Sequence, residues 1–310
     1  MKNSCSLVFI LLFFNACGVN DNQYINKECN ISTYSIDIYK GETPFDIKQI
    51  NQTPIFTACN LKDIDASFVA DPFLIKKDNI YFLFFEFLNR NTDKGEIGLA
   101  TSKDLNKFNF DRVVLEEDFH LSYPQVFLED GKYYMIPESY HSQSIRLYKF
   151  SNFPYQLEFV REILSGKKFV DNTLFKYNGI YYIFTTNPYN SELRLYYSFN
   201  LAYDWIEHPK SPIIVNNKNI ARPGGNIFTY KNKVYRVTQD DYPTYGNQVR
   251  AIEITKLTVD DYKEDTNNSK IIVKASDING SWNEMGMHQL DMHYINGYYY
   301  GIVDGKRKVE

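Results

Sequence analysis

The chain has 310 residues, which allows one large domain or two ordinary ones and is enough to bury a sizeable core. Its 34 Lys and Arg residues nearly balance 38 Asp and Glu residues, so the formal net charge is −4. That balance excludes a protein that binds nucleic acid mainly through excess positive charge. The 26 Tyr and 23 Phe residues, against 2 Trp, favour strands over helices.

The N-terminal residues have the pattern of a targeting segment. Residues 6–16 form an apolar run, which is too short for a membrane-spanning helix of about twenty residues. The run suits the core of a signal peptide, and it ends in Ala16-Cys17-Gly18. This ending resembles a lipobox, in which the cysteine is lipidated and becomes the new N-terminus. We therefore expect a lipoprotein-type signal peptide at residues 1–16, with ordinary secretion or a retained anchor as the alternatives.

Residues 17–33 are then a tether, and residues 34–310 form a single domain. On this interpretation the protein is exported and held by its lipid at a membrane of the bacterial cell envelope, in the periplasm or at the outer membrane. Cys29 and Cys59 either pair in that oxidising compartment or remain separate buried thiols. Neither has the CxxC spacing of a zinc site, so we predict no metal and no other cofactor.

The strongest signal is a repeat in which a strand, a tight turn and an aromatic strand follow one another. Each unit carries an Asn-Gly or Asp-Gly type of turn between apolar residues, which is typical of a β-hairpin. Units that recur about every fifty residues predict the blades of a propeller. The five turn residues are Asn79, Gly131, Gly179, Asn232 and Gly297.

A further strand, with no partner strand nearby in the sequence, is predicted at residues 34–39. There Tyr34, Ile36 and Ile38 alternate with Ser35, Asp37 and Tyr39. We expect it to close the ring by pairing with the last blade, around residues 288–304. The predicted fold is therefore all-β, a five-bladed β-propeller whose N-terminal strand closes the last blade.

Several motifs carry a resemblance over roughly residues 34–304. The first blade is similar to that of the arabinanase, levansucrase and invertase superfamily, which includes glycoside hydrolase family 43. A closer similarity is to the N-terminal domain of glucosamine inositolphosphorylceramide transferases. The resemblance implies a five-bladed propeller with a glycan site in its axial funnel. The motifs are at residues 39–45, 69–73, 84–86, 120–124, 134–139, 208–209, 221–225, 239–240 and 245–246.

The resemblance assigns roles to several carboxylates. Asp71 resembles the catalytic base of the glycosidase superfamily, and Asp171 resembles the third-blade aspartate that tunes the acid and holds sugar hydroxyls. Hydrolysis of a glycoside needs one protonated and one ionised carboxyl. The expected fourth-blade acid is replaced by residues 221–225, so Glu138 or Asp240 would have to serve as the acid.

The candidate residues also have structural interpretations. Asp71 can cap a turn before Pro72. Glu138 can pair with Arg222, whose guanidinium is either a structural partner or a fork for an anionic sugar or phosphate. The expected substrate-binding residues are His120, Tyr123, Arg222, Gln239, Tyr245 and His288.

Two classes of function remain. The first is a carbohydrate-active enzyme of the cell envelope, similar to a glycoside hydrolase. The second is a glycan-binding lipoprotein without catalysis on the same fold. In both, the partner is a glycan or glycoconjugate, nucleic acid is excluded and the membrane is contacted through the lipid alone.

Overall fold

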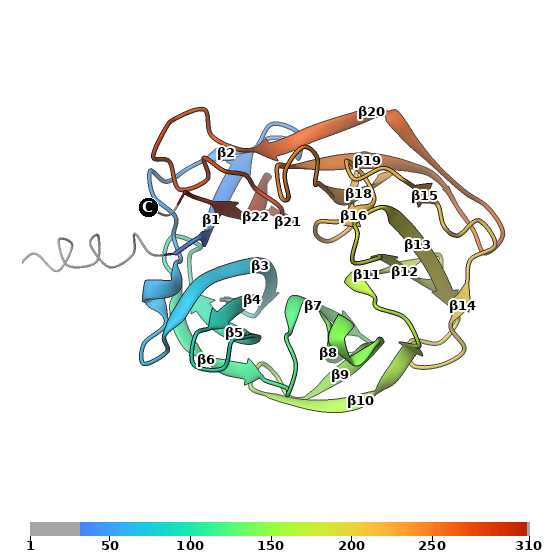
Figure 1. Ribbon diagram of the computed structural model, residues 1–310, viewed down its shortest axis with the longest axis horizontal. Coiled ribbons are helices and arrows are strands. Elements are labelled where there is room, and N and C mark those ends of the chain that lie inside the picture. Colours follow the sequence, from blue (N-terminus) through green and yellow to red (C-terminus); the bar gives the residue numbers. More distant parts are fainter. Residues whose placement is uncertain (1–31, 309–310) are drawn as a thin grey trace, which may run out of the picture.

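The computed structural model describes residues 32–308, which form five antiparallel sheets around a central axis (Figure 1). The predicted five-bladed β-propeller is therefore confirmed. Blade 1 consists of β3 (Ala66–Lys77), β4 (Ile80–Asn89), β5 (Lys94–Ser102) and β6 (Asn109–Leu115), and blade 2 of β7 (Ser122–Glu129), β8 (Lys132–Glu138), β9 (Ser144–Asn152) and β10 (Gln156–Ser165). Blade 3 consists of β11 (Val170–Tyr177), β12 (Ile180–Thr186), β13 (Glu192–Ser198), β14 (Ile206–Glu207) and β15 (Ile214–Val215).

Blade 4 has a first strand in two pieces. It consists of β16 (Arg222–Pro223), β17 (Phe228–Tyr230), β18 (Lys233–Asp240), β19 (Gln248–Leu257) and β20 (Tyr262–Lys274). Blade 5 combines both ends of the described chain: β21 (Leu290–Ile295), β22 (Tyr298–Lys306), β1 (Tyr34–Gly41) and β2 (Lys48–Gln49). The helical elements of the described part are two short 3₁₀ turns, η2 (Ala58–Asn60) and η3 (Tyr140–Ser142).

The five hairpin turns lie where the sequence pattern puts them, between the first and second strands of each blade. In the turns at Gly131, Gly179 and Gly297 both central residues have positive φ, as a two-residue turn between twisted strands requires. The glycine meets this requirement without a steric cost from a Cβ atom.

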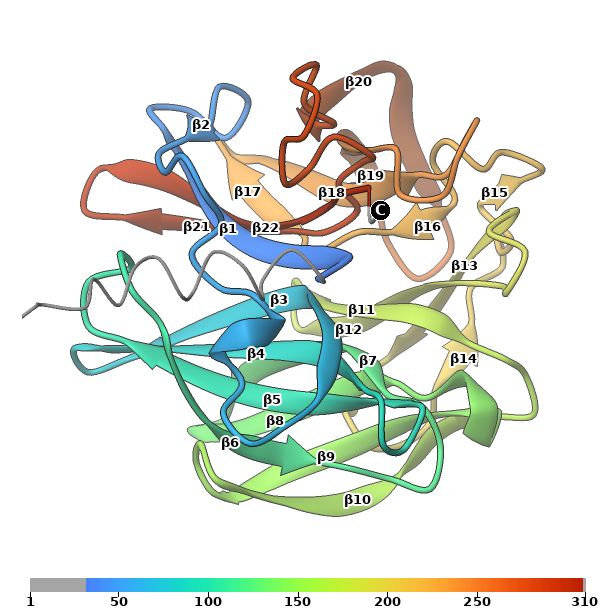
Figure 2. The same cartoon turned by 60° about the vertical axis from the view of Figure 1, so that its left-hand side comes forward.

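Ring closure also follows the prediction. Strand β1 pairs antiparallel with β22, from Tyr34 opposite Lys306 to Gly41 opposite Tyr299. Figure 2 shows β1 lying beside β22 across the seam between the first and last parts of the chain. Opening the ring would therefore break the hydrogen bonds of a complete sheet.

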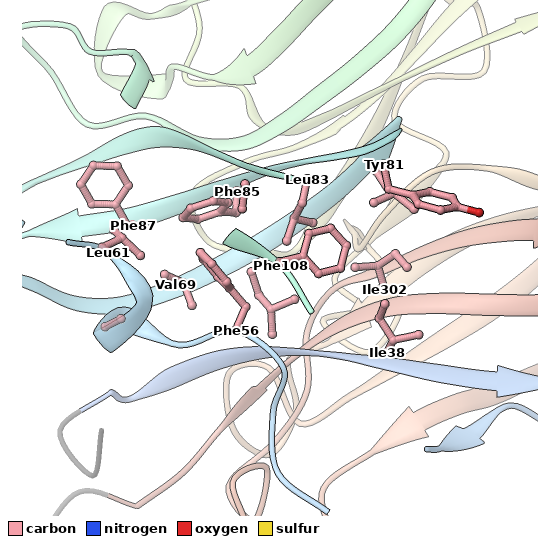
Figure 3. Packing of buried hydrophobic residues seen from close by; sticks show 14 of the residues in the cluster. Ile38, Phe56, Leu61, Val69, Tyr81, Leu83, Phe85, Phe87, Phe108 and Ile302 are labelled. Atoms are coloured by element: carbon pink, nitrogen blue, oxygen red, sulfur yellow. The ribbon is translucent and has the colours of Figure 1, made fainter. Parts of the chain in front are cut away.

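The apolar core is divided among the boundaries between blades. At the seam between blades 5 and 1, Ile38 and Ile302 pack with Leu83, Phe85 and Phe56 (Figure 3). Inner and middle strands are covered on both faces, so strands such as β4 and β12 bury residues of both parities. The large number of Tyr and Phe residues serves mainly this packing.

A belt of hydrogen bonds joins all five blades at the axis. Asp291 accepts bonds from the Leu74 amide (2.7 Å) and from Asn226 Nδ2 (2.7 Å). Gln125 donates to Asn226 Oδ1 (2.6 Å) and exchanges two bonds with the Leu174 backbone. The belt fixes the relative positions of the inner strands, on which the candidate site depends.

Candidate functional site in the axial funnel

Three inner strands carry a β-bulge at the same position of the blade. Asp71 in β3, Tyr123 in β7 and Asp171 in β11 each lie at a register shift with φ between 45° and 52°. Positive φ is uncommon for residues other than glycine, and bulges re-aim side chains. The Asp71 carboxylate accepts the Tyr123 amide across the blade boundary (3.1 Å). The three bulges therefore bring neighbouring blades together at one end of the axis. We call the region around Asp71, Tyr123 and Asp171 the funnel.

Asp71 lies in a buried chain of three titratable groups. Its Oδ1 is 3.9 Å from His288 Nε2, and His288 Nδ1 is 2.7 Å from Asp304 Oδ1. Asp304 Oδ2 also accepts the Asp71 amide (2.9 Å). Burial lowers the pKa of His288, but the charges of Asp304 and Asp71 outweigh that effect and raise the pKa to about 9. Burial raises the pKa of Asp71, and the imidazolium opposes this rise only in part.

The second carboxyl pair lies between blades 2 and 3. Glu138 Oε2 accepts the amide of Asp171 (3.0 Å), while Asp171 Oδ2 accepts bonds from Arg222 Nε and Gln239 Nε2, both at 2.6 Å. Burial and the charge of Asp171 raise the pKa of Glu138, and Arg222 opposes the rise only in part. The two carboxyls thus differ in environment: Asp171 is held by cationic and amide donors, and Glu138 is biased toward its neutral, proton-donating form.

Arg222 joins this pair to the rim of the funnel. Its Nη1 donates to Asn190 Oδ1 (3.2 Å) in the loop between β12 and β13, and its guanidinium carbon lies 5.0 Å from the centre of the Tyr245 ring. Tyr245 in turn packs edge-on against His288, with ring centroids 5.6 Å apart. One continuous wall therefore joins the Asp71–Asp304 pair to the Glu138–Asp171 pair. It is made of Arg222, Tyr245 and His288.

His120 lies at the side of blade 1. Its Nε2 is 3.0 Å from Glu86 Oε1, and its Nδ1 accepts the amide of Gly95 (2.9 Å). Burial lowers the pKa of His120, but Glu86 outweighs burial and raises it. The charge of Glu86 also raises the pKa of Asp71. His120 thus orients a carboxylate that acts electrostatically on Asp71.

Tyr123 is fully buried below these groups. Its hydroxyl is 2.7 Å from Thr173 Oγ1 and accepts the amide of Gly225 (2.6 Å), so one side chain of blade 2 joins blades 3 and 4. These contacts make Tyr123 part of the funnel floor.

The glycines of blade 4 explain why that blade carries no glutamate there. Gly225 has a φ of 142°, and a Cβ atom on it would lie 1.8 Å from the Leu290 carbonyl oxygen. A Cβ atom on Gly224 would lie 2.9 Å from the Gln239 nitrogen. No side chain fits at either position, so the acid of the glycosidase superfamily cannot be placed there.

Asp240 does not join the cluster. Its carboxylate accepts bonds from Asn219 Nδ2 (2.6 Å), Gln248 Nε2 (2.7 Å) and Arg250 Nε (2.8 Å). Successive strand residues point to opposite faces, and the preceding residue Gln239 faces Asp171. The structure thus brings together Asp71, Glu138, Asp171, Arg222, Gln239, Tyr245 and His288, with His120 beside them, and pairs Asp240 elsewhere.

Sequence reasoning missed four residues of the funnel. Glu86 and Asp304 lie near the ends of the second strands of their blades, as Glu138 does, and that equivalence was the available signal. Asp241 directly follows β18, and Tyr34 comes from the closure strand. Among the described residues, one group has the side chains and spacing that a metal ion would need. It consists of Asp71, His288 and Asp304, whose ligand atoms lie within 4.8 Å of one another. With its raised pKa, His288 itself supplies positive charge between the two carboxylates.

The two remaining sequence predictions concern cysteines. Cys17, the expected lipidation residue, lies outside the described residues. Cys59 is disulfide-bonded, and Cys29 also lies outside the described residues. Within residues 32–308 no helix has the length and apolar character needed to cross a membrane.

The described chain is a five-bladed propeller with buried carboxylates near its axis, and glycoside hydrolases of known structure share the propeller fold. The α-L-arabinanase of Cellvibrio cellulosa with arabinohexaose has a TM-score of 0.55 and 12% identity, covering 74% of this chain and 88% of that one. The GH62 α-L-arabinofuranosidase of Coprinopsis cinerea has a TM-score of 0.59 and 11% identity, covering 89% and 98%. At these identities the likeness concerns the fold.

The chain belongs to the family described as glucosamine inositolphosphorylceramide transferase 1, N-terminal, which matches residues 26–306. It is 33% identical over 301 residues to the glucosamine inositolphosphorylceramide transferase 1 of Oryza sativa subsp. japonica, and 31% identical over 306 residues to that of Arabidopsis thaliana. These alignments cover 89% and 91% of this chain but 40% of each relative. The chain thus spans less than half the length of the curated relatives it matches.

These relatives correct one expectation. Both are plant proteins, whereas a lipobox is a signal of bacterial export. The prediction of a membrane-anchored lipoprotein in a bacterial cell envelope is therefore wrong. The apolar N-terminal run on which it rested is a general feature of targeting segments.

Proposed function

We propose that the propeller binds a glycan or glycoconjugate in its axial funnel and acts on a glycosidic bond by chemistry similar to that of glycoside hydrolases. The observation that carries the proposal is the set of buried carboxyls at one end of the axis, where Glu138 is next to Asp171 and Asp71 is next to the imidazole of His288. The similarity to glycosidases in fold, and to transferases named for a glycosylated inositolphosphorylceramide in sequence, supports a sugar-containing substrate.

Glu138 is the proposed general acid. Burial and the neighbouring Asp171 keep its carboxyl neutral, so it can give a proton to the glycosidic oxygen as the bond to the anomeric carbon breaks. Asp171, held by Arg222 and Gln239, keeps that proton in place and accepts bonds from sugar hydroxyls.

Asp71 is the proposed base or nucleophile. Burial and the charges of nearby carboxylates raise its pKa, while the His288 imidazolium lowers it in part and the Tyr123 amide donates to the carboxylate. Ionisation of Asp71 is then the step that prepares it to react. It then either takes a proton from the attacking water or attacks the anomeric carbon itself. Its partner Asp304 holds the imidazole ring in a fixed orientation through Nδ1.

Binding without catalysis is the second candidate, and one observation favours it. Gly224 and Gly225 leave no room for the fourth-blade acid, while Glu138 already accepts the amide of Asp171 through one oxygen. In this alternative the same carboxyls hold sugar hydroxyls and transfer no proton.

The test compares methyl and nitrophenyl glycosides of α-L-arabinofuranose, β-D-galactose and β-D-xylose, together with those of β-D-glucosamine. We expect the wild type to bind and cleave at least one of them. Glu138→Gln should lose cleavage of the methyl glycoside but keep part of that of the nitrophenyl glycoside, whose leaving group needs no proton. Asp71→Asn should lose both and still bind. Asp277→Asn makes the same change on an exposed carboxylate and should behave as wild type.

The outcomes separate the candidates. Binding of a glycoside without cleavage by the wild type supports the binding protein and removes the enzyme. Absence of both binding and cleavage for the whole panel contradicts a site for these sugars. If Glu138→Gln loses cleavage of the methyl and the nitrophenyl glycoside to the same extent, Glu138 is not the acid.

A further inference from the structure

The funnel wall contains buried polar atoms that have no hydrogen-bond partner among the described residues. Two of them belong to residues that the proposed chemistry does not use, the hydroxyl of Tyr34 and Oδ2 of Asp241. These residues are 8% and 7% exposed. Asp171 Oδ1 and Gln239 Oε1 are unpartnered in the same way, and both residues already belong to the site.

Direct contacts place Tyr34 in the funnel. Its ring stacks on His288, with centroids 4.8 Å apart and planes inclined by 21°. Burial raises the pKa of Tyr34, and the charges of Asp304 and Asp71 raise it further. The hydroxyl therefore keeps its proton and lies within electrostatic reach of both carboxylates.

Asp241 reaches the same wall from blade 4. Its Oδ1 accepts the amide of Gly246 (2.9 Å), a residue whose Cα hydrogens face the His288 ring so closely that a Cβ atom would lie 3.1 Å from His288 Cβ. Burial raises the pKa of Asp241, with Arg222 and His288 opposing the rise and Asp171 adding to it. One oxygen is thus fixed by the backbone, and the other is left for a different partner.

Buried polar atoms without a partner cost free energy, and folded proteins retain few of them. Asp241 Oδ2, Asp171 Oδ1 and Gln239 Oε1 are acceptors, and the Tyr34 hydroxyl can both donate and accept. A ligand that bonds to these atoms must therefore present hydrogen-bond donors, as the hydroxyl groups of a sugar ring do.

We propose that Tyr34 and Asp241 are sugar-binding residues, and that the Tyr34 hydroxyl and Asp241 Oδ2 bond to hydroxyl groups of the sugar that Asp171 and Gln239 hold. This inference rests on the proposed function and deepens it by naming the residues that read the hydroxyl pattern. It also makes the closure strand β1 a part of the binding site, because Tyr34 is its first residue.

The test measures stability and binding in the same variants, Tyr34→Phe and Asp241→Asn. Each removes or alters one unpartnered polar atom and keeps the shape of the side chain. We expect the unfolding temperature without sugar to stay equal or rise. We expect the affinity for the best-bound methyl glycoside among those of α-L-arabinofuranose, β-D-galactose, β-D-xylose and β-D-glucosamine to fall about tenfold, as the loss of one hydrogen bond implies.

Matched controls are Tyr294→Phe and Asp277→Asn, which make the same changes on exposed residues and should alter neither quantity. A structural role predicts the opposite pattern, with a lower unfolding temperature and an unchanged affinity, and that result would overturn the inference. If the wild type and both variants bind equally well, this inference fails while the proposed function stands. If the wild type binds none of the four glycosides, both fail.

Discussion

Tyr34 stacks on His288, and this contact joins the strand that closes the propeller to the group that lies between the carboxylates of Asp71 and Asp304. Tyr34 begins β1 and His288 lies just before β21, so the two residues come from opposite ends of the described chain. Pairing of β1 with the last blade is therefore what places Tyr34 against His288. A change that opens the seam should remove the site as well as the fold.

The first prediction tests closure with Ile36→Ala. Ile36 is fully buried in the cluster between blades 5 and 1, so the substitution should lower the free energy of unfolding by about 2–5 kcal/mol. Urea unfolding followed by both circular dichroism and fluorescence should show one shifted transition. Ile278→Ala, at an exposed isoleucine, should change the free energy little. A second, earlier transition confined to β1 would show that the seam opens independently of the ring.

The second prediction concerns Asp37, a fully buried residue of β1. Burial raises its pKa to about 6 from 3.8, although Asn51 donates a hydrogen bond to it. Folding thus favours the protonated form, and the stabilisation that this gives is complete below about pH 3.8 and lost as the pH rises to about 6. Asp37→Asn should therefore be more stable than wild type by roughly 2–3 kcal/mol at pH 7, with the difference vanishing near pH 4. Unfolding temperatures at both pH values measure this, and an equal difference at the two would contradict it.

The third prediction concerns the pH dependence that His288 contributes. Its pKa is raised to about 9 from 6.5, so the stabilisation from the imidazolium is complete below about pH 6.5 and lost between pH 6.5 and 9. His288→Asn should be less stable overall because the stacking on Tyr34 is lost. Its unfolding temperature should nevertheless fall less than that of the wild type between pH 6.5 and 9. Parallel curves for the two proteins over that range would count against a charged His288.

The fourth prediction tests the close approach of blades 4 and 5. Gly225→Ala should destabilise the protein by more than about 3 kcal/mol, because the Cβ atom would clash with the Leu290 carbonyl. Gly280→Ala is the matched control, since Gly280 also has a positive φ but open space around it, and its cost should be about 1–2 kcal/mol. Denaturant unfolding compares them. Similar costs would mean that the blades can separate at Gly225, and that a side chain fits there after all.

The sequence predicted the propeller because its evidence was local. The turns at Gly131 and Gly179 require positive φ, which favours glycine. The alternation of side chains in β1 indicates a strand that must pair with another part of the chain. The site depends on long-range register, which no local pattern contains. Asp240 and Asp241 look alike in the sequence, but the pairing of Asp240 with Gln248 at the end of β18 directs it to Arg250, and Asp241 in the following loop reaches the funnel.

The same reason explains the residues that sequence reasoning missed. In the pair of β1 and β22, Tyr34 lies opposite Lys306 and Asp304 lies opposite Ile36. Only ring closure brings this pair beside Asp71, whose amide donates to Asp304. The motif predicts that Tyr123 binds substrate, and in the structure its hydroxyl accepts the amide of Gly225 in blade 4. The resemblance identified the motif, and the packing decides which of its side chains face the funnel.

A sugar site in the funnel is tested most directly by a crystal structure of Glu138→Gln soaked with the methyl glycoside that the wild type binds best. We expect one sugar ring in the funnel, with hydroxyl groups within hydrogen-bond distance of Asp171 and Asp241 and the glycosidic oxygen next to residue 138. A sugar bound on an outer face of the blades, with the funnel side chains in their present contacts, would contradict it.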